Sequence, residues 1–169
     1  MRFVVVAFLA VLLSFSAFAQ DGKKAKPMAE TFTATSLDGN EFDLSALKGK
    51  VVLITFWSTK CPICAAEIPK LNELAETYKN KDVVFLGLTT ENEKGVKAHL
   101  KKKPFDFNIL PNSFGVLLAY ADKDKDGNVA MGYPAHFLIN QKGELELKNS
   151  GFGKTKIIAE RINQLLSSK

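Results

Sequence analysis

The chain has 169 residues, of which 46% are hydrophobic and 24% are charged, and its formal net charge is +5. These fractions fit one ordinary domain with a core large enough for a sheet, and they exclude an intrinsically disordered chain. Two cysteines are too few for a disulfide-dense scaffold or for the four ligands of a structural zinc site.

Residues 1–19 have the pattern of a cleavable export signal. Arg2 supplies a positive start, an apolar run extends from Phe3 to Phe18, and Ala17–Ala19 offers a small-x-small cleavage site. We predict cleavage after this site and a soluble mature protein in the periplasm or an equivalent extracytoplasmic space. The alternative is a retained membrane anchor, because the apolar run is near the shortest length that spans a bilayer.

Export also bears on the partners of the mature chain. The polar residues 20–29 are expected to form a flexible linker ahead of a domain at 30–169. The lysine runs Lys23–Lys26 and Lys101–Lys103 are expected to be solvated surface, because an exported protein has little access to nucleic acid. We therefore expect no nucleic-acid partner, and membrane contact only if the signal is retained.

Strands and helices are predicted to alternate along the mature chain, as is typical of an α/β layer fold. The turn at Asp38–Asn40 favours a β-hairpin between two short flanking strands. The continuous apolar run Val51–Trp57 predicts a central strand buried on both faces. The other expected elements are helices near 62–80, 94–103, 113–120 and 155–166, and strands near 83–89, 107–110, 135–140 and 144–148.

Both cysteines directly follow the central strand, in Cys61-Pro62-Ile63-Cys64. Pro62 is expected to be the first helical residue, where its missing N–H costs nothing. Cys61 then caps the helix, and Cys64 lies one turn further on, within reach of a disulfide. The positive end of the helix dipole is expected to lower the pKa of Cys61. The spacing predicts a redox pair; a weakly stabilising structural disulfide and a metal site are the alternatives.

The two sulfurs are expected to differ in exposure. Cys64 shares an apolar helix face with Ile68 and Leu71, so it should point inward, whereas Cys61 lies at the exposed tip. An exposed thiolate attacks a substrate disulfide, and a buried partner then resolves the mixed disulfide. Glu67, one turn beyond Cys64, is a candidate for proton exchange with Cys64; a solvated surface carboxylate is the alternative.

These motifs, in this order, resemble the thioredoxin superfamily and, within it, the exported TlpA/ResA-like thiol-disulfide oxidoreductases. The resemblance covers about residues 30–169 and implies an α/β thioredoxin-like fold, with a central mixed sheet flanked by helices and an N-terminal β-hairpin extension. The residues that carry it are Leu37–Asn40, Leu47–Val52, Phe56–Trp57, Cys61–Cys64 with Glu67 and Pro69, and Tyr133–Asn140 with Lys142–Gly143.

The resemblance also implies a site and its partners. Pro134 would be cis and face the disulfide, Tyr133 and Pro134 would contact the substrate, and Glu67 would assist proton transfer. The implied activity is the reduction of protein disulfides outside the cytoplasm, often for cytochrome c assembly, with electrons from a membrane donor and no cofactor. Thr55 stands where ordinary thioredoxins carry a buried carboxylate, which leaves Glu67 as the obvious local acid.

Two other functions stay open. A peroxiredoxin needs a proline seven residues and a threonine three residues before its reactive cysteine, where this chain has Ile54 and Ser58. A copper-handling protein would combine both cysteines with a histidine, because thiolates suit Cu(I). We expect His99 to be solvated and His136 to be turned away from the cysteines by strand alternation, so no metal site is predicted.

The segment 121–132, just before Pro134, is polar and rich in turn-forming residues. Its Asp122–Gly127 stretch matches the first half of an EF-hand loop, but position twelve is Tyr133 rather than Glu, so a polar turn is predicted. We expect the loop to project into solvent beside the redox pair and to select substrates. An insertion without a role is the alternative.

Overall fold

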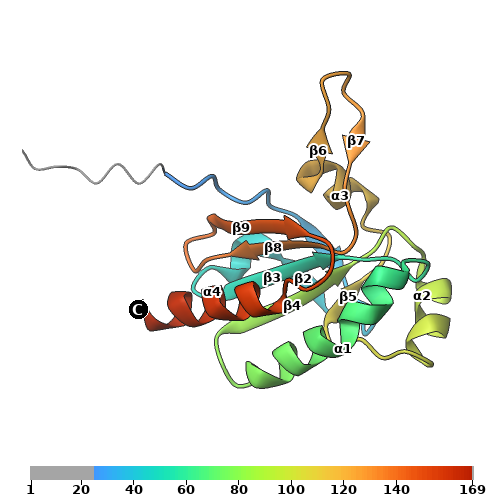
Figure 1. Cartoon of the computed structure of the whole chain (residues 1–169), viewed down its shortest axis with the longest axis horizontal. Helices are drawn as coiled ribbons and strands as arrows, with labels where there is room; N and C mark the ends of the chain where they lie inside the picture. Colours follow the sequence, from blue (N-terminus) through green and yellow to red (C-terminus); the bar gives the residue numbers. More distant parts are fainter. Residues whose placement is uncertain (1–24, 169) are drawn as a thin grey trace, which may run out of the picture.

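The computed structural model describes residues 25–168, so the predicted signal at 1–19 lies outside the described residues. The central feature is a five-stranded sheet in the order β5-β4-β3-β8-β9 (Figure 1). Its strands are β3 (Val51–Phe56), β4 (Val83–Leu88), β5 (Asn108–Leu110), β8 (Ala135–Ile139) and β9 (Leu145–Ser150). The first three run parallel, whereas β8 and β9 are antiparallel to their neighbours, which confirms the predicted mixed sheet.

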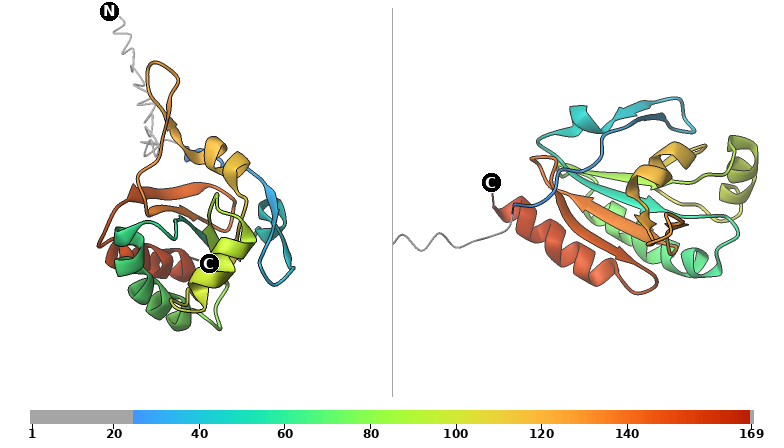
Figure 2. Two further views of the ribbon diagram at one scale, coloured as in Figure 1. Left: turned by 90° about the vertical axis from the view of Figure 1, so that its right-hand side faces the viewer. Right: turned by 90° about the horizontal axis from the view of Figure 1, so that it is seen from above.

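Helices cover both faces of this sheet (Figure 2). One face packs against α1 (Pro62–Thr77), α2 (Glu93–Leu100) and α4 (Thr155–Ser167). The other packs against α3 (Phe114–Tyr120), the hairpin β1–β2 (Thr33–Thr35 and Glu41–Asp43) and the 3-10 turn η1 (Leu44–Leu47). The N-terminal hairpin is therefore confirmed. No helix within residues 25–168 is both long and apolar enough to cross a membrane.

The central strand β3 positions the redox pair. All six of its residues are buried, as its continuous apolar run predicts. Side chains alternate between the faces, so Leu53 and Trp57 join the core cluster beneath α1, whereas Ile54 and Phe56 join the opposite cluster. Because β3 and β4 are parallel, a crossover must connect them, and it contains α1, which begins at Pro62 after a short loop from the end of β3.

The segment just before β1 lies along the sheet edge. Met28 bridges Glu144, the Leu145 N–H donates to the Pro27 carbonyl at 2.8 Å, and the Ala29 N–H donates to the Gly143 carbonyl at 2.9 Å. These residues belong to the stretch that we predicted to be a flexible linker. The polar composition of this stretch indicated a linker, because the pairing depends on residues 143–145, which are more than 100 positions away in the sequence.

A second hairpin projects from the body of the molecule, as the loop prediction required (Figure 1). Its strands β6 (Asp122–Lys123) and β7 (Val129–Ala130) are antiparallel. The hydrogen bond from the Asn128 side chain, together with backbone N–H donors, lowers the pKa of Asp124 in the turn. The predicted polar turn is thus confirmed, and a role in substrate selection stays a prediction.

Candidate redox site

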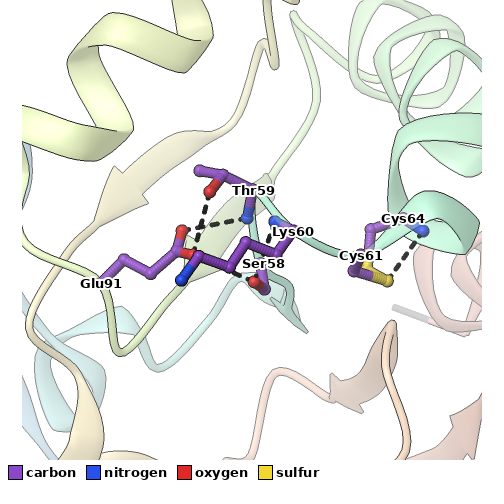
Figure 3. The surroundings of a disulfide bond; sticks show 6 residues. All are labelled: Ser58, Thr59, Lys60, Cys61, Cys64 and Glu91. Carbon is purple, nitrogen blue, oxygen red and sulfur yellow. Dashed lines mark hydrogen bonds between the residues drawn. A yellow bond between two sulfur atoms is a disulfide. The ribbon is translucent and has the colours of Figure 1, made fainter.

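Cys61 and Cys64 form a disulfide at the start of α1 (Figure 3). Pro62 is the first helical residue, Cys61 is the N-cap, and the Cα atoms of the two cysteines are 5.2 Å apart. The Cys64 N–H donates to the Cys61 sulfur at 3.0 Å. The positive end of the helix therefore faces the Cys61 sulfur, which is the arrangement that stabilises a thiolate after reduction.

The two sulfurs differ in exposure as expected. Cys64 is only 1% exposed and belongs to the core cluster between the sheet and α1, whereas Cys61 is partly exposed. Ile63, between them, is 48% exposed. A large substrate therefore has access to Cys61 but not to Cys64 in this conformation.

Glu91 holds the loop that leads into Cys61 (Figure 3). Its carboxylate accepts hydrogen bonds from the Ser58 hydroxyl at 3.1 Å, the Thr59 N–H at 3.0 Å and the Thr59 hydroxyl at 2.9 Å. The Cys61 N–H in turn donates to the Ser58 carbonyl at 3.2 Å. No local motif in the sequence marks Glu91 as a site residue, because it follows α1 and β4 in the chain, far from Cys61.

Pro134 lies at the same end of the sheet, directly before β8, which runs antiparallel to β3. The Tyr133–Pro134 bond is cis, and Pro134 is buried. Ala135 pairs with Phe56, so the residue before it lies beside the chain that leaves β3 toward the disulfide. Tyr133 is half-buried; burial, and then the charge of Glu91, raise the pKa of its hydroxyl.

Glu67 is fully buried, so the solvated-surface alternative is wrong. Its carboxylate accepts one backbone N–H from Gly153 at 3.0 Å and one from Lys154 at 3.2 Å. These donors precede α4, so Glu67 on α1 supplies the acceptor that the start of α4 otherwise lacks. Glu67 is thus brought one helical turn behind Cys64 in a dry, hydrogen-bonded position.

His136 is the main departure from the sequence-based expectations. Its neighbour Leu138, two residues along β8, packs in the same core cluster as Cys64, so strand alternation turns His136 toward the Cys64 side and not away from it. Its Nδ1 lies 3.0 Å from the hydroxyl of Thr55, and both residues are fully buried. Burial, and then the charge of Lys154, lower the pKa of His136 to about 4.

The second histidine also differs from its prediction. His99 was expected to be solvated, but its ring lies 5.9 Å from that of Trp57, and its Nε2 is buried. Amphipathic spacing on α2 did not indicate this contact, because Trp57 directly follows β3 and is far from α2 in the sequence. In the part of the chain that the structure describes, no three Cys, His, Asp or Glu side chains are grouped to hold a metal ion.

Comparison with known proteins settles the family. The redoxin family model matches residues 20–164. The chain belongs to the redoxin family. It is 33% identical over 117 residues to the soluble secreted antigen MPT53 of Mycobacterium tuberculosis, a match that covers 69% of this chain and 66%, just under two thirds, of that protein. It is also 33% identical over 125 residues to the thiol-disulfide oxidoreductase ResA of Bacillus cereus, covering 73% of this chain and 68% of ResA.

The fold agrees with this assignment. A thioredoxin-family thiol:disulfide interchange protein of Chlorobium tepidum superposes on this redoxin with a TM-score of 0.72 at 23% identity, over 84% of this chain and 97% of the other. At this identity the likeness shows the fold alone. Together with the sequence relatives, it places the chain in the TlpA/ResA-like group of thiol-disulfide oxidoreductases within the thioredoxin superfamily, which confirms the resemblance read from the motifs.

Proposed function

We propose that this redoxin reduces disulfides of client proteins outside the cytoplasm, with Cys61 as the attacking group and Cys64 as the resolving group. The observation that carries the proposal is the unequal pair: a partly exposed sulfur at a helix N-cap and a buried sulfur one turn behind it. The predicted export signal and the name of the secreted mycobacterial relative support the location.

The reaction begins with the reduced pair. The Cys61 thiolate attacks one sulfur of the client disulfide; that disulfide breaks, and its other sulfur leaves as a thiolate. The Cys64 thiol then gives up its proton, and the resulting thiolate attacks the Cys61 sulfur. The second client sulfur leaves as a thiolate, so two electrons have passed to the client and the Cys61–Cys64 disulfide has formed. An electron donor, which we propose is a membrane protein, must then reduce this disulfide.

Glu67 is the proposed proton carrier for Cys64. It is buried one turn behind Cys64 on the same helix, and backbone N–H donors fix its carboxylate. A carboxylate held in this way has a fixed position one helical turn from Cys64, the group that must lose a proton when it resolves the mixed disulfide. Its role is separable from that of Cys61, which lies at the solvent side of the helix start.

Tyr133 and Pro134 are the proposed contacts for the client chain. They lead into β8 beside the chain that carries the disulfide, and Tyr133 is partly exposed. The family resemblance adds one class of client, the cysteines of proteins undergoing cytochrome c assembly. The proposed unit that performs this work is a domain at 30–169, released from a signal at 1–19.

The equilibrium reduction potential tests the direction of electron flow. The protein is equilibrated with glutathione and dithiothreitol buffers, and the fraction of Cys61–Cys64 disulfide is read by alkylation and mass spectrometry. A reductant should have a potential nearer to that of thioredoxin, about −270 mV, than to that of the oxidant DsbA, about −120 mV. A value close to the oxidant would reverse the proposed direction while leaving the exchange chemistry in place.

A further inference from the structure

A polar pair lies within the apolar layer behind the disulfide. Thr55 and His136 are adjacent across β3 and β8, and both are fully buried in strands whose other residues are apolar. Leu53 and Leu138, which share their face of the sheet, pack in one cluster with Cys64. The pair therefore lies on the side of the sheet that the resolving cysteine occupies.

One nitrogen of this pair has no partner. Nδ1 of His136 interacts with the Thr55 hydroxyl at 3.0 Å, whereas its Nε2 is buried without a hydrogen bond to any described residue. Asn149, opposite His136 on β9, likewise has buried amide atoms without a described partner. A buried polar atom without a partner costs about 1–3 kcal/mol, so a group of this kind calls for a functional explanation.

Burial, and then the charge of Lys154, keep the imidazole of His136 neutral while the disulfide is formed. Burial and the nearby Lys154 hold its pKa near 4, far below physiological pH. Thr55 on β3 and Asn149 on β9 pair with His136, and Lys154 before α4 acts on it through its charge. On α1, Cys64 belongs to the core cluster on the same face of the sheet, and Glu67 is buried one turn behind it. Nε2 of His136 and the amide atoms of Asn149 are buried without a described partner, and of these only the imidazole nitrogen is basic enough to take up a proton.

We propose that His136 is a second proton-exchanging group of the redox pair beside Glu67, and that its Nε2 shares with Glu67 the task of accepting the proton that Cys64 releases when it resolves a mixed disulfide. The proposal assigns the tautomer in which Nδ1–H donates to the Thr55 oxygen and Nε2 carries the lone pair. It rests on the thiol-disulfide chemistry of the proposed function but not on its direction or its clients.

The proton transfer from Cys64 to His136 balances. The S–H bond of Cys64 breaks and an N–H bond forms at His136, so a thiolate and an imidazolium arise together in a low-dielectric layer, where opposite charges stabilise each other. The Cys64 thiolate then forms its bond to the Cys61 sulfur, the bond between Cys61 and the client sulfur breaks, and the client sulfur leaves as a thiolate with that electron pair. With the Cys64 thiolate consumed, the imidazolium of His136 loses its stabilising partner and gives its proton to the departing client thiolate.

Two-phase kinetics with dithionitrobenzoate separate the two cysteines. Attack by Cys61 on the reagent releases one thionitrobenzoate, and resolution by Cys64 releases the second. His136→Leu should slow the second phase about tenfold or more and move its pH dependence to higher pH, while the first phase stays within about twofold. His99→Gln, at the other histidine of the chain, is the matched control and should leave both phases unchanged.

If His136→Leu fails to fold, a second variant and a measurement on protein that keeps His136 still test the proposal. Thr55→Val removes the tautomer-fixing hydroxyl and should slow the same phase. In protein whose Cys61 is blocked by S-methylation, the ring signals of His136 in 15N-edited NMR should shift as Cys64 loses its proton, and those of His99 should not.

An unchanged second phase in folded His136→Leu, or His136 signals that stay constant through the ionisation of Cys64, overturns the inference. Loss of the first phase in the protein without substitutions would instead contradict the proposed function, so the two failures are distinguishable.

Discussion

The two sides of the redox pair are built differently, although one helical turn separates the sulfurs. In front, Cys61 is partly exposed, caps α1 and follows a loop that Glu91 holds by three hydrogen bonds. Behind, Cys64 is buried in an apolar layer that also contains Glu67 and His136. Two identical side chains thus have different surroundings: a helix end and solvent for Cys61, and an apolar layer with buried titratable groups for Cys64.

Each side has its own physical task. The front must keep a thiolate available to a large client, which a helix N-terminus achieves without any buried charge. In the proposed reaction, the back must accept and release the proton of Cys64 away from water, a task for buried groups that exchange protons. Variants that disturb one side and spare the other therefore distinguish the two tasks.

Removal of either cysteine should separate the two roles completely. Cys61→Ser should abolish disulfide reduction, because the attacking sulfur is lost. Cys64→Ser should keep the attack but stall at a mixed disulfide between Cys61 and the client, visible on a non-reducing gel and by mass spectrometry. Stable client adducts formed by Cys61→Ser through Cys64 would show that the two roles are reversed.

Acid should destabilise the disulfide form through His136. Its pKa is about 4 in the folded protein and about 6.5 in an unfolded chain, so between these values the unfolded state binds the extra proton and stability falls as pH falls. The expected loss from pH 7 to pH 5 is about 2 kcal/mol in urea unfolding. His136→Leu should lack this part of the pH dependence; an identical pH slope in both proteins would argue against a neutral buried imidazole.

Glu67→Gln should lower the free energy of unfolding by about 1–3 kcal/mol, because the amide places an N–H₂ group against one of two backbone donors. It should also slow the resolving phase with dithionitrobenzoate. Glu73→Gln is the matched control, since Glu73 is exposed on the same helix, and it should change stability by less than about 0.5 kcal/mol. Equal unfolding free energies and equal resolving rates for the two variants would contradict the proposed role of Glu67.

Glu91→Ala should act on the front alone. The loop through Ser58 and Thr59 loses three hydrogen bonds, so Cys61 is held less firmly and its attack should slow about threefold to tenfold. The first phase with dithionitrobenzoate measures this directly. Glu93→Ala, two residues away on the exposed first turn of α2, should leave that phase unchanged. A slowed second phase with a normal first phase would contradict the assignment of Glu91 to the front.

The front could be predicted from the sequence because its determinants are neighbours in the chain. The apolar run Val51–Trp57, Pro62 after Cys61, and the helical spacing of Cys64 with Ile68 all lie within one short segment. These local signals were enough to predict the buried strand, the helix start and the unequal exposure of the sulfurs, which the structure confirms.

The back could be predicted only in part, because it is assembled from distant segments. Thr55 and His136 are 81 residues apart, and Glu67 and Gly153 are 86 apart. All five residues of β8 are buried, so its sequence does not alternate between polar and apolar positions and does not reveal which face His136 occupies. Glu91 escaped prediction for the same reason, since its partners precede Cys61 while it follows β4.

The central claim is that Cys61 is the reactive thiolate and Cys64 its protected partner. Alkylation of the fully reduced protein over pH 5–9, with each cysteine quantified by mass spectrometry, tests it most directly. The account predicts that Cys61 is labelled at least about tenfold faster than Cys64 at neutral pH, with a pKa below the free value of about 8.5. Equal labelling of the two cysteines, or faster labelling of Cys64, would contradict it.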